Sequence, residues 1–167
     1  MTAREIRNIK AIAMDVDGVL TDGTFWWGPN GEEFKRFCFA DSTGISLALK
    51  SGLKVALISG ESSDAGKTLV QRYADKLKIS DVFKGCHDKK AAVEAFARKH
   101  DLTLLDICYI GDDLIDTEAM SIVGFAVCPS DAHRSAKSNA QLITSKKGGR
   151  GAVREVVDLL LSDSAGD

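Results

Sequence analysis

Acidic side chains follow two short apolar runs of this 167-residue chain, and their spacing suits chemistry at phosphorus. Asp15 and Asp17 come directly after the apolar run at 9–14. Asp112 follows a second such run at 107–110. Residues i and i+2 of a strand lie on the same side, so Asp15 and Asp17 could address one substrate. One carboxylate could attack phosphorus, and the other could protonate the leaving oxygen and then activate water.

The same acidic groups predict a metal ion. Carboxylates from two strands could not all ionise close together without a compensating charge. Mg²⁺ fits best, because it binds one or two carboxylates together with waters and a substrate phosphate. Asp116 lies one helical turn after Asp112 and could join the group. Asp112, Asp113 and Asp116 also have a plainer explanation, as a helix N-cap and first-turn acidic residues, which the helix dipole favours.

Two further polar residues could bind the transferring phosphoryl group. Ser59 ends the apolar run at 54–58, and Lys89 begins a predicted helix. A hydroxyl and an ammonium group there could stabilise the equatorial phosphoryl oxygens. Each also has a structural alternative: Ser59 could cap a helix, and Lys89, beside Lys90, could lie on a solvated helix face.

Short apolar strands alternate with helices along the whole chain. This alternation predicts an α/β fold with a doubly wound, Rossmann-like, mainly parallel sheet, whose ligand site lies beyond the carboxyl ends of the strands. We expect strands at 9–14, 54–58, 81–83, 107–110, 125–127 and 142–143. We expect helices from Asp41 to a C-terminal glycine at Gly52, at 64–77, 89–100, 116–123 and 153–161, and between the last two strands.

Residues 24–39 separate the first strand from the first helix. Aromatic residues flank the turn at 28–31, so we predict an inserted β-hairpin. A thin hairpin cannot bury Phe25, Trp26 and Trp27 by itself. We expect one domain over 1–167, with a frayed tail at 162–167.

Composition argues against several classes of partner. Lys and Arg number 22 and Asp and Glu 24, a net charge of −2, which gives no basic surface for nucleic acid or anionic membranes. No apolar run has the length of a membrane span, and the N-terminal residues lack the apolar core of a secretory signal. The four cysteines form no CxxC pair, so we expect free thiols. We therefore expect a cytoplasmic protein that binds neither nucleic acid nor membrane.

Four motifs, in order, resemble those of the haloacid dehalogenase superfamily of phosphatases. They are DVDGVLTDG from Asp15, Ser59 after a strand, GCHDK ending at Lys89, and GDDLID from Gly111. The chain has no cap domain after the first or second motif. It is similar to the capless branch that acts on phosphorylated 2-keto-3-deoxy sugar acids, and the similarity extends from about Ile9 through GGRGAVRE at 148–155.

The resemblance implies a role for each motif residue. Asp15 would be the nucleophile and Asp17 the general acid and base, while Ser59 and Lys89 would bind the phosphoryl group. The resemblance also implies a homotetramer in which the hairpins pack together and neighbouring subunits close the site.

The resemblance implies a metal site as well. Asp15, the Asp17 carbonyl and Asp112 would hold Mg²⁺. Asp116 would orient Lys89 or a metal-bound water.

The implied reaction is hydrolysis of a phosphomonoester through an aspartyl-phosphate. The first-choice substrate is 3-deoxy-D-manno-octulosonate 8-phosphate, and the alternative is a 2-keto-3-deoxy-nonulosonate or N-acylneuraminate 9-phosphate. Glu61 stands where octulosonate phosphatases usually have Arg, and Glu cannot pair with a substrate carboxylate. Glu61 could instead accept hydrogen bonds from sugar hydroxyls, as in the nine-carbon relatives, although a surface role for it is equally consistent. The candidate substrate-binding residues are Asp41, Ser42, Gly60, Glu61 and Lys76.

Two other functional classes remain. A receiver-type phosphoacceptor also uses an Asp cluster and a Lys, but Asp17 is placed to hydrolyse the phosphate that a receiver keeps. A non-catalytic tetramer-forming module, of the kind fused to nucleotide-sugar enzymes, would not need the intact acidic motifs. The basic loop at 146–150 is either solvated or reaches an anionic substrate.

Overall fold

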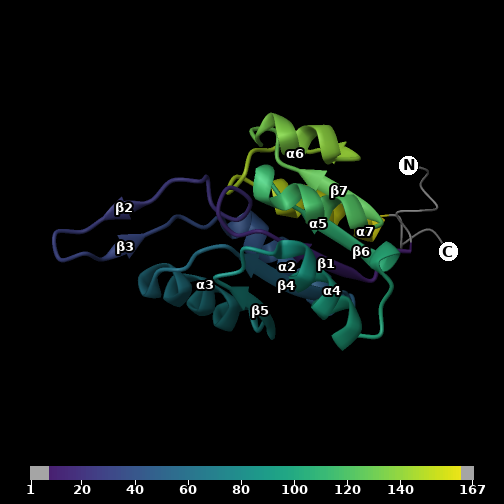
Figure 1. The fold of residues 1–167 in the computed structure, drawn as a ribbon, viewed down its shortest axis with the longest axis horizontal. Helices are drawn as coiled ribbons and strands as arrows, with labels where there is room; N and C mark the ends of the chain where they lie inside the picture. Colours follow the sequence, from purple (N-terminus) through teal and green to yellow (C-terminus); the bar gives the residue numbers. More distant parts are fainter. Residues whose placement is uncertain (1–7, 163–167) are drawn as a thin grey trace.

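The computed structural model describes residues 8–162, and its centre is a parallel sheet (Figure 1). Six strands follow the order β5-β4-β1-β6-β7-β8, and every neighbouring pair is parallel. The predicted α/β class with a doubly wound parallel sheet is confirmed. The strands are β1 (Ala11–Met14), β4 (Lys54–Ser59), β5 (Asp81–Lys84), β6 (Ile107–Ile110), β7 (Phe125–Cys128) and β8 (Leu142–Ile143).

The strand register brings the polar motifs to one edge. Met14 at the end of β1 is level with Leu57 in β4 and Ile110 in β6. Strands β1, β6 and β7 are buried along their whole length, which is typical of a parallel sheet covered on both faces. Because parallel strands end on the same side, Asp15, Ser59 and Gly111 all leave the sheet at this edge.

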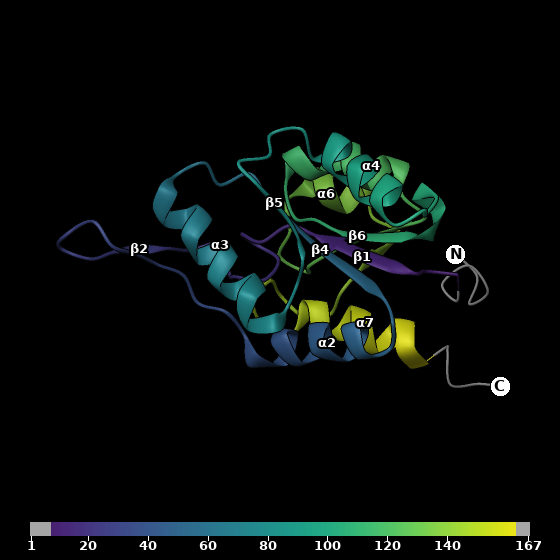
Figure 2. The same cartoon turned by 90° about the horizontal axis from the view of Figure 1, so that it is seen from below.

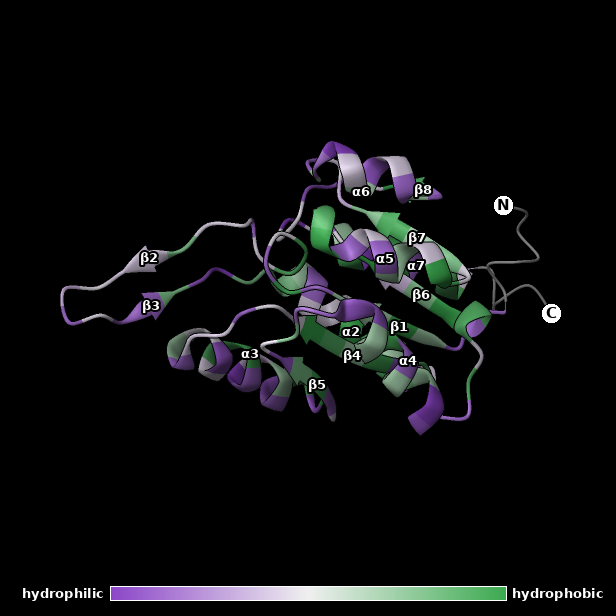
Figure 3. Ribbon diagram, in the orientation of Figure 1, coloured by the Kyte–Doolittle hydropathy of each residue, from purple (hydrophilic) through white to green (hydrophobic). Residues whose placement is uncertain are grey.

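Helices cover both faces of the sheet (Figure 2). One face packs on α2 (Phe39–Lys50), α3 (Asp64–Leu77) and α7 (Ala152–Ser162). The other packs on α4 (Lys89–Lys99), α5 (Thr117–Ile122) and α6 (Arg134–Asn139), with the short 3₁₀ helices η1 (Leu104–Asp106) and η2 (Leu114–Asp116) beside them. Apolar strands therefore lie between two helical layers whose outer sides are largely polar (Figure 3). No helix within residues 8–162 is long and apolar enough to cross a membrane.

The inserted hairpin is present and projects from the body of the molecule (Figure 1). Strands β2 (Trp26–Trp27) and β3 (Glu33–Phe34) pair antiparallel, with Trp26 opposite Phe34. The predicted hairpin range, 24–39, was too long at its end. Phe39 is the first residue of α2, two residues before the predicted start at Asp41, and its exposed aromatic ring made a helical residue resemble the hairpin sequence.

The other predicted elements differ from the structure by at most two residues at each end, and η1 was not predicted. Gly52 follows the end of α2 with a positive φ of 95°, as the predicted C-terminal glycine requires. Of the tail expected to fray, Ser162 belongs to α7, and residues 163–167 lie outside the described residues.

Asp41 joins helices that are far apart in sequence. It is fully buried, and its two carboxylate oxygens accept hydrogen bonds of 3.0 Å from the backbone N–H groups of Gly151 and Arg154 at the start of α7. Gly44 allows this close packing, because a Cβ there would lie 3.0 Å from the Cα of Arg154. These contacts account for Asp41 by helix packing rather than by the predicted contact with substrate.

Replacing Asp41 by Ala should therefore destabilise the fold and spare substrate binding. Two N–H groups at the start of α7 would lose their acceptor, so the free energy of unfolding should fall by about 1–3 kcal/mol. Urea unfolding measures the change. Asp158→Ala is the matched control: it removes a surface carboxylate that pairs with Arg154 and should change stability by less than about 0.5 kcal/mol. An Asp41→Ala protein of normal stability with a raised KM would restore the substrate role.

Candidate active site

Three motif residues meet at the carboxyl edge of the sheet. The Lys89 ammonium at the start of α4 lies 2.7 Å from the Asp15 carboxylate and 2.8 Å from that of Asp116. All three side chains are almost completely buried. Lys89 is therefore not a solvated surface lysine but the cation between two buried carboxylates from different strand ends.

Asp116 is the hydrogen-bonding centre of this group. One carboxylate oxygen accepts from Lys89 and, at 2.7 Å, from the Tyr109 hydroxyl, and the other accepts from the backbone N–H groups of Asp112 and Asp113. Asp113 accepts from the Leu114 N–H and caps η2, as its structural alternative predicted. Sequence reasoning missed Tyr109; the available signal was a phenol in an otherwise aliphatic buried strand, where the hydroxyl needs a partner.

The buried carboxylates are short of positive charge. Burial raises the pKa of Asp15 to about 7, although Lys89 opposes the shift. Burial, reinforced by the charges of Asp15 and Asp116, raises the pKa of Asp112 to about 8. Burial is the larger cause of both pKa shifts, and the neighbouring carboxylates add to it because one cation cannot neutralise three of them.

A divalent cation would satisfy the group. Oxygens of Asp15, Asp112 and Asp116 lie within 4.8 Å of one another, and Asp112 Oδ1 is buried without a hydrogen-bond partner. Oxygen ligands of this kind suit Mg²⁺. Asp112 is the best-placed ligand because its Oδ1 has no partner, and Asp15, with one contact on each oxygen, retains more free acceptor capacity than Asp116, which accepts two hydrogen bonds on each. Gly18, at a positive φ of 83°, makes room for Asp112, since a Cβ there would clash with the Asp112 carboxylate.

The end of β4 supplies a second wall. Ser59 is fully buried, and its hydroxyl accepts a hydrogen bond of 3.1 Å from the N–H of Glu61. Ser63, rather than Ser59, caps the following helix, so the helix-cap alternative for Ser59 is wrong. Gly60 lies between Ser59 and Glu61 and is partly exposed.

The hairpin contributes a residue that sequence reasoning missed. The Lys35 ammonium lies 3.0 Å from the Asp17 carboxylate and 3.2 Å from that of Glu61, and the Lys35 side chain is only 4% exposed. Lys35 thereby connects Asp17, the general acid and base that the resemblance implies, to Glu61 in the loop after β4. The available signal was a single lysine after the acidic pair Glu32–Glu33 in a segment otherwise interpreted as a subunit contact.

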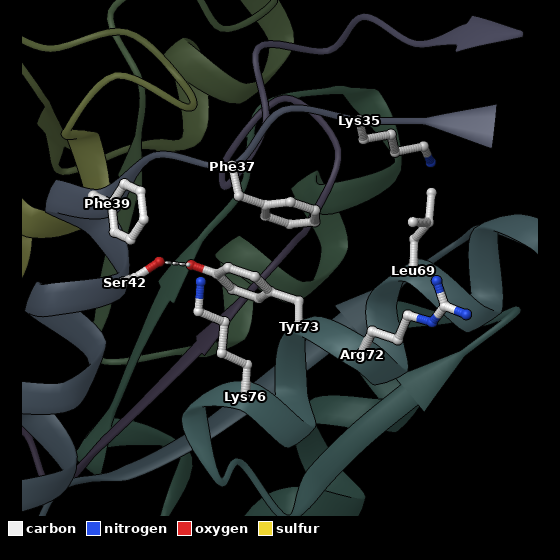
Figure 4. A pocket seen from close by; sticks show the side chains of 8 residues that line it. All are labelled: Lys35, Phe37, Phe39, Ser42, Leu69, Arg72, Tyr73 and Lys76. Atoms are coloured by element: carbon white, nitrogen blue, oxygen red, sulfur yellow. Dashed lines mark hydrogen bonds between the residues drawn. The ribbon is translucent and has the colours of Figure 1, made fainter. Parts of the chain in front are cut away.

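A cavity of about 250 Å³ opens beside Lys35 (Figure 4). Phe37 stacks on Tyr73 with ring centroids 4.1 Å apart, and the Tyr73 hydroxyl bonds Ser42 at 3.0 Å. Three cationic side chains reach the cavity: Lys35, Arg72 and Lys76. Two of the predicted substrate-binding residues, Ser42 and Lys76, therefore lie together in one cavity, whereas Asp41 is used in helix packing.

Comparison with known proteins agrees with this geometry. Residues 48–156 match the model of the haloacid dehalogenase-like hydrolases. The chain is 42% identical over 154 residues to the 3-deoxy-D-manno-octulosonate 8-phosphate phosphatase of Escherichia coli strain K12, which is 92% of this chain and 80% of that protein. The chain belongs to the haloacid dehalogenase-like hydrolase family. The resemblance drawn from the four motifs is thus confirmed.

Solved structures of this haloacid dehalogenase-like family are similar over nearly the whole chain. The 3-deoxy-D-manno-octulosonate 8-phosphate phosphatase of Yersinia pestis has a TM-score of 0.91 at 38% identity, with 96% of this chain and 85% of that chain covered. The Moraxella catarrhalis phosphatase of the same name, in complex with magnesium ion, phosphate ion and KDO, also has a TM-score of 0.91, at 37% identity, covering 96% and 90%. The magnesium ion of the Moraxella catarrhalis structure agrees with the oxygen donor set that Asp15 and Asp112 offer here.

Mg²⁺ should stabilise the protein through Asp112. Binding to the folded state alone should add about 2.7 kcal/mol to the free energy of unfolding at 100 times the Kd. Asp112→Asn should remove most of that gain. Without Mg²⁺ the Asp112→Asn protein should be at least as stable as the wild type, because the substitution removes a buried carboxyl group that has no cation of its own. Thermal unfolding with and without Mg²⁺ measures both effects.

Asp113→Asn is the matched control for this experiment. Its side chain is 60% exposed, so the Mg²⁺-dependent rise in Tm should persist. An undiminished rise in the Asp112→Asn protein would exclude Asp112 as a ligand.

Proposed function

We propose that this chain hydrolyses 3-deoxy-D-manno-octulosonate 8-phosphate, as a Mg²⁺-dependent phosphatase. The observation that carries the proposal is the contact of Lys89 with both Asp15 and Asp116 at the sheet edge where Asp112 offers a free oxygen. Relatives similar over nearly the whole chain have this activity in their names, and one holds magnesium, phosphate and KDO.

The residues of the site divide the reaction into two steps. An Asp15 oxygen attacks phosphorus, the bond from phosphorus to the sugar oxygen breaks, and the departing oxygen takes a proton from Asp17. Water then attacks the phosphoaspartate, Asp17 takes the water proton, and inorganic phosphate and free Asp15 result. A nucleophile followed two residues later by an acid and base favours this hydrolysis over a receiver-type phosphoacceptor.

Other residues stabilise the charges of these steps. In this proposal Lys89, which is hydrogen-bonded to Asp116, and Ser59 at the end of β4 bind the oxygens of the phosphoryl group. Asp15, Asp112 and the Asp17 carbonyl would hold Mg²⁺, which would supply charge neutralisation at the phosphoryl group.

The cavity beside Lys35 suits the acid end of the substrate. Arg72 and Lys76 line it together with Lys35, while the Phe37 and Tyr73 rings form an apolar side. A sugar acid carries one carboxylate and many hydroxyls, which such cationic and hydroxyl groups can bind. This use of the cavity favours an enzyme over a non-catalytic module.

A second candidate substrate is a nonulosonate 9-phosphate. Glu61 stands where octulosonate phosphatases usually have Arg, and its carboxylate is held by the Ser63 N–H and by Lys35. An oriented carboxylate can accept hydrogen bonds from the hydroxyls of a longer sugar but repels a substrate carboxylate. Glu61 is therefore the residue expected to distinguish the two acids.

We also propose that the hairpins pack between four copies of the chain. Phe25, Trp26, Trp27 and Phe34 are each more than half exposed on the projecting hairpin (Figure 1). A contiguous exposed apolar surface of this kind is typical of a protein interface.

Phosphate release with Mg²⁺ from the two sugar acids, measured side by side, tests the substrate. We expect at least a tenfold higher kcat/KM for octulosonate 8-phosphate, equivalent to about 1.4 kcal/mol in the barrier. Asp15→Asn should abolish release while circular dichroism stays unchanged, because the nucleophile is gone. Retention of a tenth of the activity would contradict the role of Asp15, and a tenfold preference for the nine-carbon acid would establish the second candidate.

Glu61→Arg should shift preference further toward the eight-carbon acid. A guanidinium group could pair with the carboxylate that both acids carry, but it would lose the hydrogen bonds that Glu61 could accept from the hydroxyls of the longer sugar. The ratio of kcat/KM values for the two acids measures the shift. Glu61→Gln is the matched control, because it weakens the contact with Lys35 without adding a cation. A ratio that stays the same in both variants would exclude Glu61 from substrate selection.

A further inference from the structure

Lys35 holds three carboxylates from three segments of the chain. Its ammonium lies 3.0 and 3.1 Å from the two carboxylate oxygens of Asp17. Glu61 of the loop after β4 lies at 3.2 Å, and Glu33 of β3 lies at 3.3 Å. Although Lys35 directly follows a hairpin strand, its side chain is only 4% exposed. The hairpin therefore sends one buried cation into the wall of the active site.

The Asp17 carboxylate has no other anchor within residues 8–162. Its side chain is 38% exposed, and Lys35 is its one bonded partner in that range. Asp15, by contrast, is held by both the Val16 N–H and Lys89. The position of the Asp17 oxygens therefore depends on Lys35.

The charge on Lys35 is secure. Burial by itself lowers the pKa of a lysine, but hydrogen bonds and charges from Asp17, Glu61 and Glu33 outweigh it and raise the pKa of Lys35 overall. The Lys35 ammonium therefore stays charged and remains between the three carboxylates.

We propose that Lys35 is a positioning residue that fixes the Asp17 carboxyl for proton transfer to the leaving sugar oxygen and ties it to the hairpin. The proposal rests on the role of Asp17 as general acid and base. Lys35 itself forms and breaks no covalent bond and transfers no proton in either step. A misplacement of about 1 Å at a catalytic group can cost roughly 100-fold in rate. Holding the Asp17 carboxyl in one position should therefore have a large effect on the rate.

The dependence on the leaving group distinguishes positioning of the acid from general support of the fold. The sugar alkoxide is a poor leaving group and needs a proton from the general acid, whereas 4-nitrophenolate leaves readily without one. Lys35→Met keeps an apolar side chain of similar length and removes the charge. We expect roughly a 30-fold lower kcat/KM on octulosonate 8-phosphate and less than about a threefold change on 4-nitrophenyl phosphate, because kcat/KM reports the phosphoryl-transfer step and not the hydrolysis of the phosphoaspartate that both substrates share. Lys35→Arg should recover most of the activity on the sugar phosphate.

Arg36→Met is the matched control. Arg36 is the next residue of the same segment and bonds Asp22 at 2.7 Å rather than Asp17. Its loss should change kcat/KM on both substrates by less than about threefold. Equal losses on both substrates in the Lys35→Met protein, or no loss on either, would overturn the proposal.

A double-mutant cycle tests whether Lys35 acts through Asp17. In an Asp17→Asn background, Lys35→Met should cause no further loss on the sugar phosphate, and a second loss of full size would overturn the proposal. If circular dichroism shows that Lys35→Met is unfolded, Lys35→Gln carries the same test.

A series of aryl phosphates with leaving groups of rising pKa makes the result independent of the sugar. Asp17→Asn should steepen the dependence of kcat/KM on leaving-group pKa, and Lys35→Met should do the same. No change in Asp17→Asn would overturn the acid and base role and the positioning role together. A change in Asp17→Asn without one in Lys35→Met would overturn the positioning role alone.

Discussion

The burial of several carboxylates at one edge of the sheet is the constraint on which this site depends. Asp15, Asp112 and Asp116 lie within 4.8 Å of one another, and within residues 8–162 Lys89 is the cation that pairs with them. Burial, reinforced by the neighbouring carboxylates, raises the pKa values of Asp15 and Asp112. A divalent cation and a phosphoryl group complete the charge balance together, because the cation offsets the carboxylates while the lysine offsets the phosphate.

The fold maintains this electrostatically unfavourable group of carboxylates by burying and hydrogen-bonding the residues around it. Strands β1 and β6 are buried throughout, Asp116 accepts four hydrogen bonds, and Gly18 leaves room for Asp112 where a Cβ would clash. The far end of the chain takes part as well, since Asp41 fixes the start of α7 against α2. Preorganisation of this kind means that little movement is needed when substrate binds.

Features that depend on the local sequence pattern were predicted, whereas contacts that depend on tertiary packing were missed. Period and chain order were enough to place the strands and to bring Asp15, Ser59 and Asp112 to one edge, because parallel strands end together. The α3 range, 64–77, was predicted correctly, although its cap is Ser63 and not Ser59. The contacts of Asp41 with residues 110 and 113 positions away, and of Lys35 with Asp17 and Glu61, have no local signature. Asp41 in the first turn of a helix therefore looked available to a ligand, although the tertiary fold uses both its oxygens.

The contacts of Lys35 also connect the hairpin to the chemistry. The segment that exposes Phe25, Trp26 and Trp27 continues directly into the residue that bonds Asp17 and lines the cationic cavity. If these aromatic residues are buried between copies of the chain, the assembly orders the hairpin and, with it, Lys35 and the acid. In a family member without a cap domain, the oligomer would then fix the acid and close the cavity over the sugar, which is the role of the cap domain in other members.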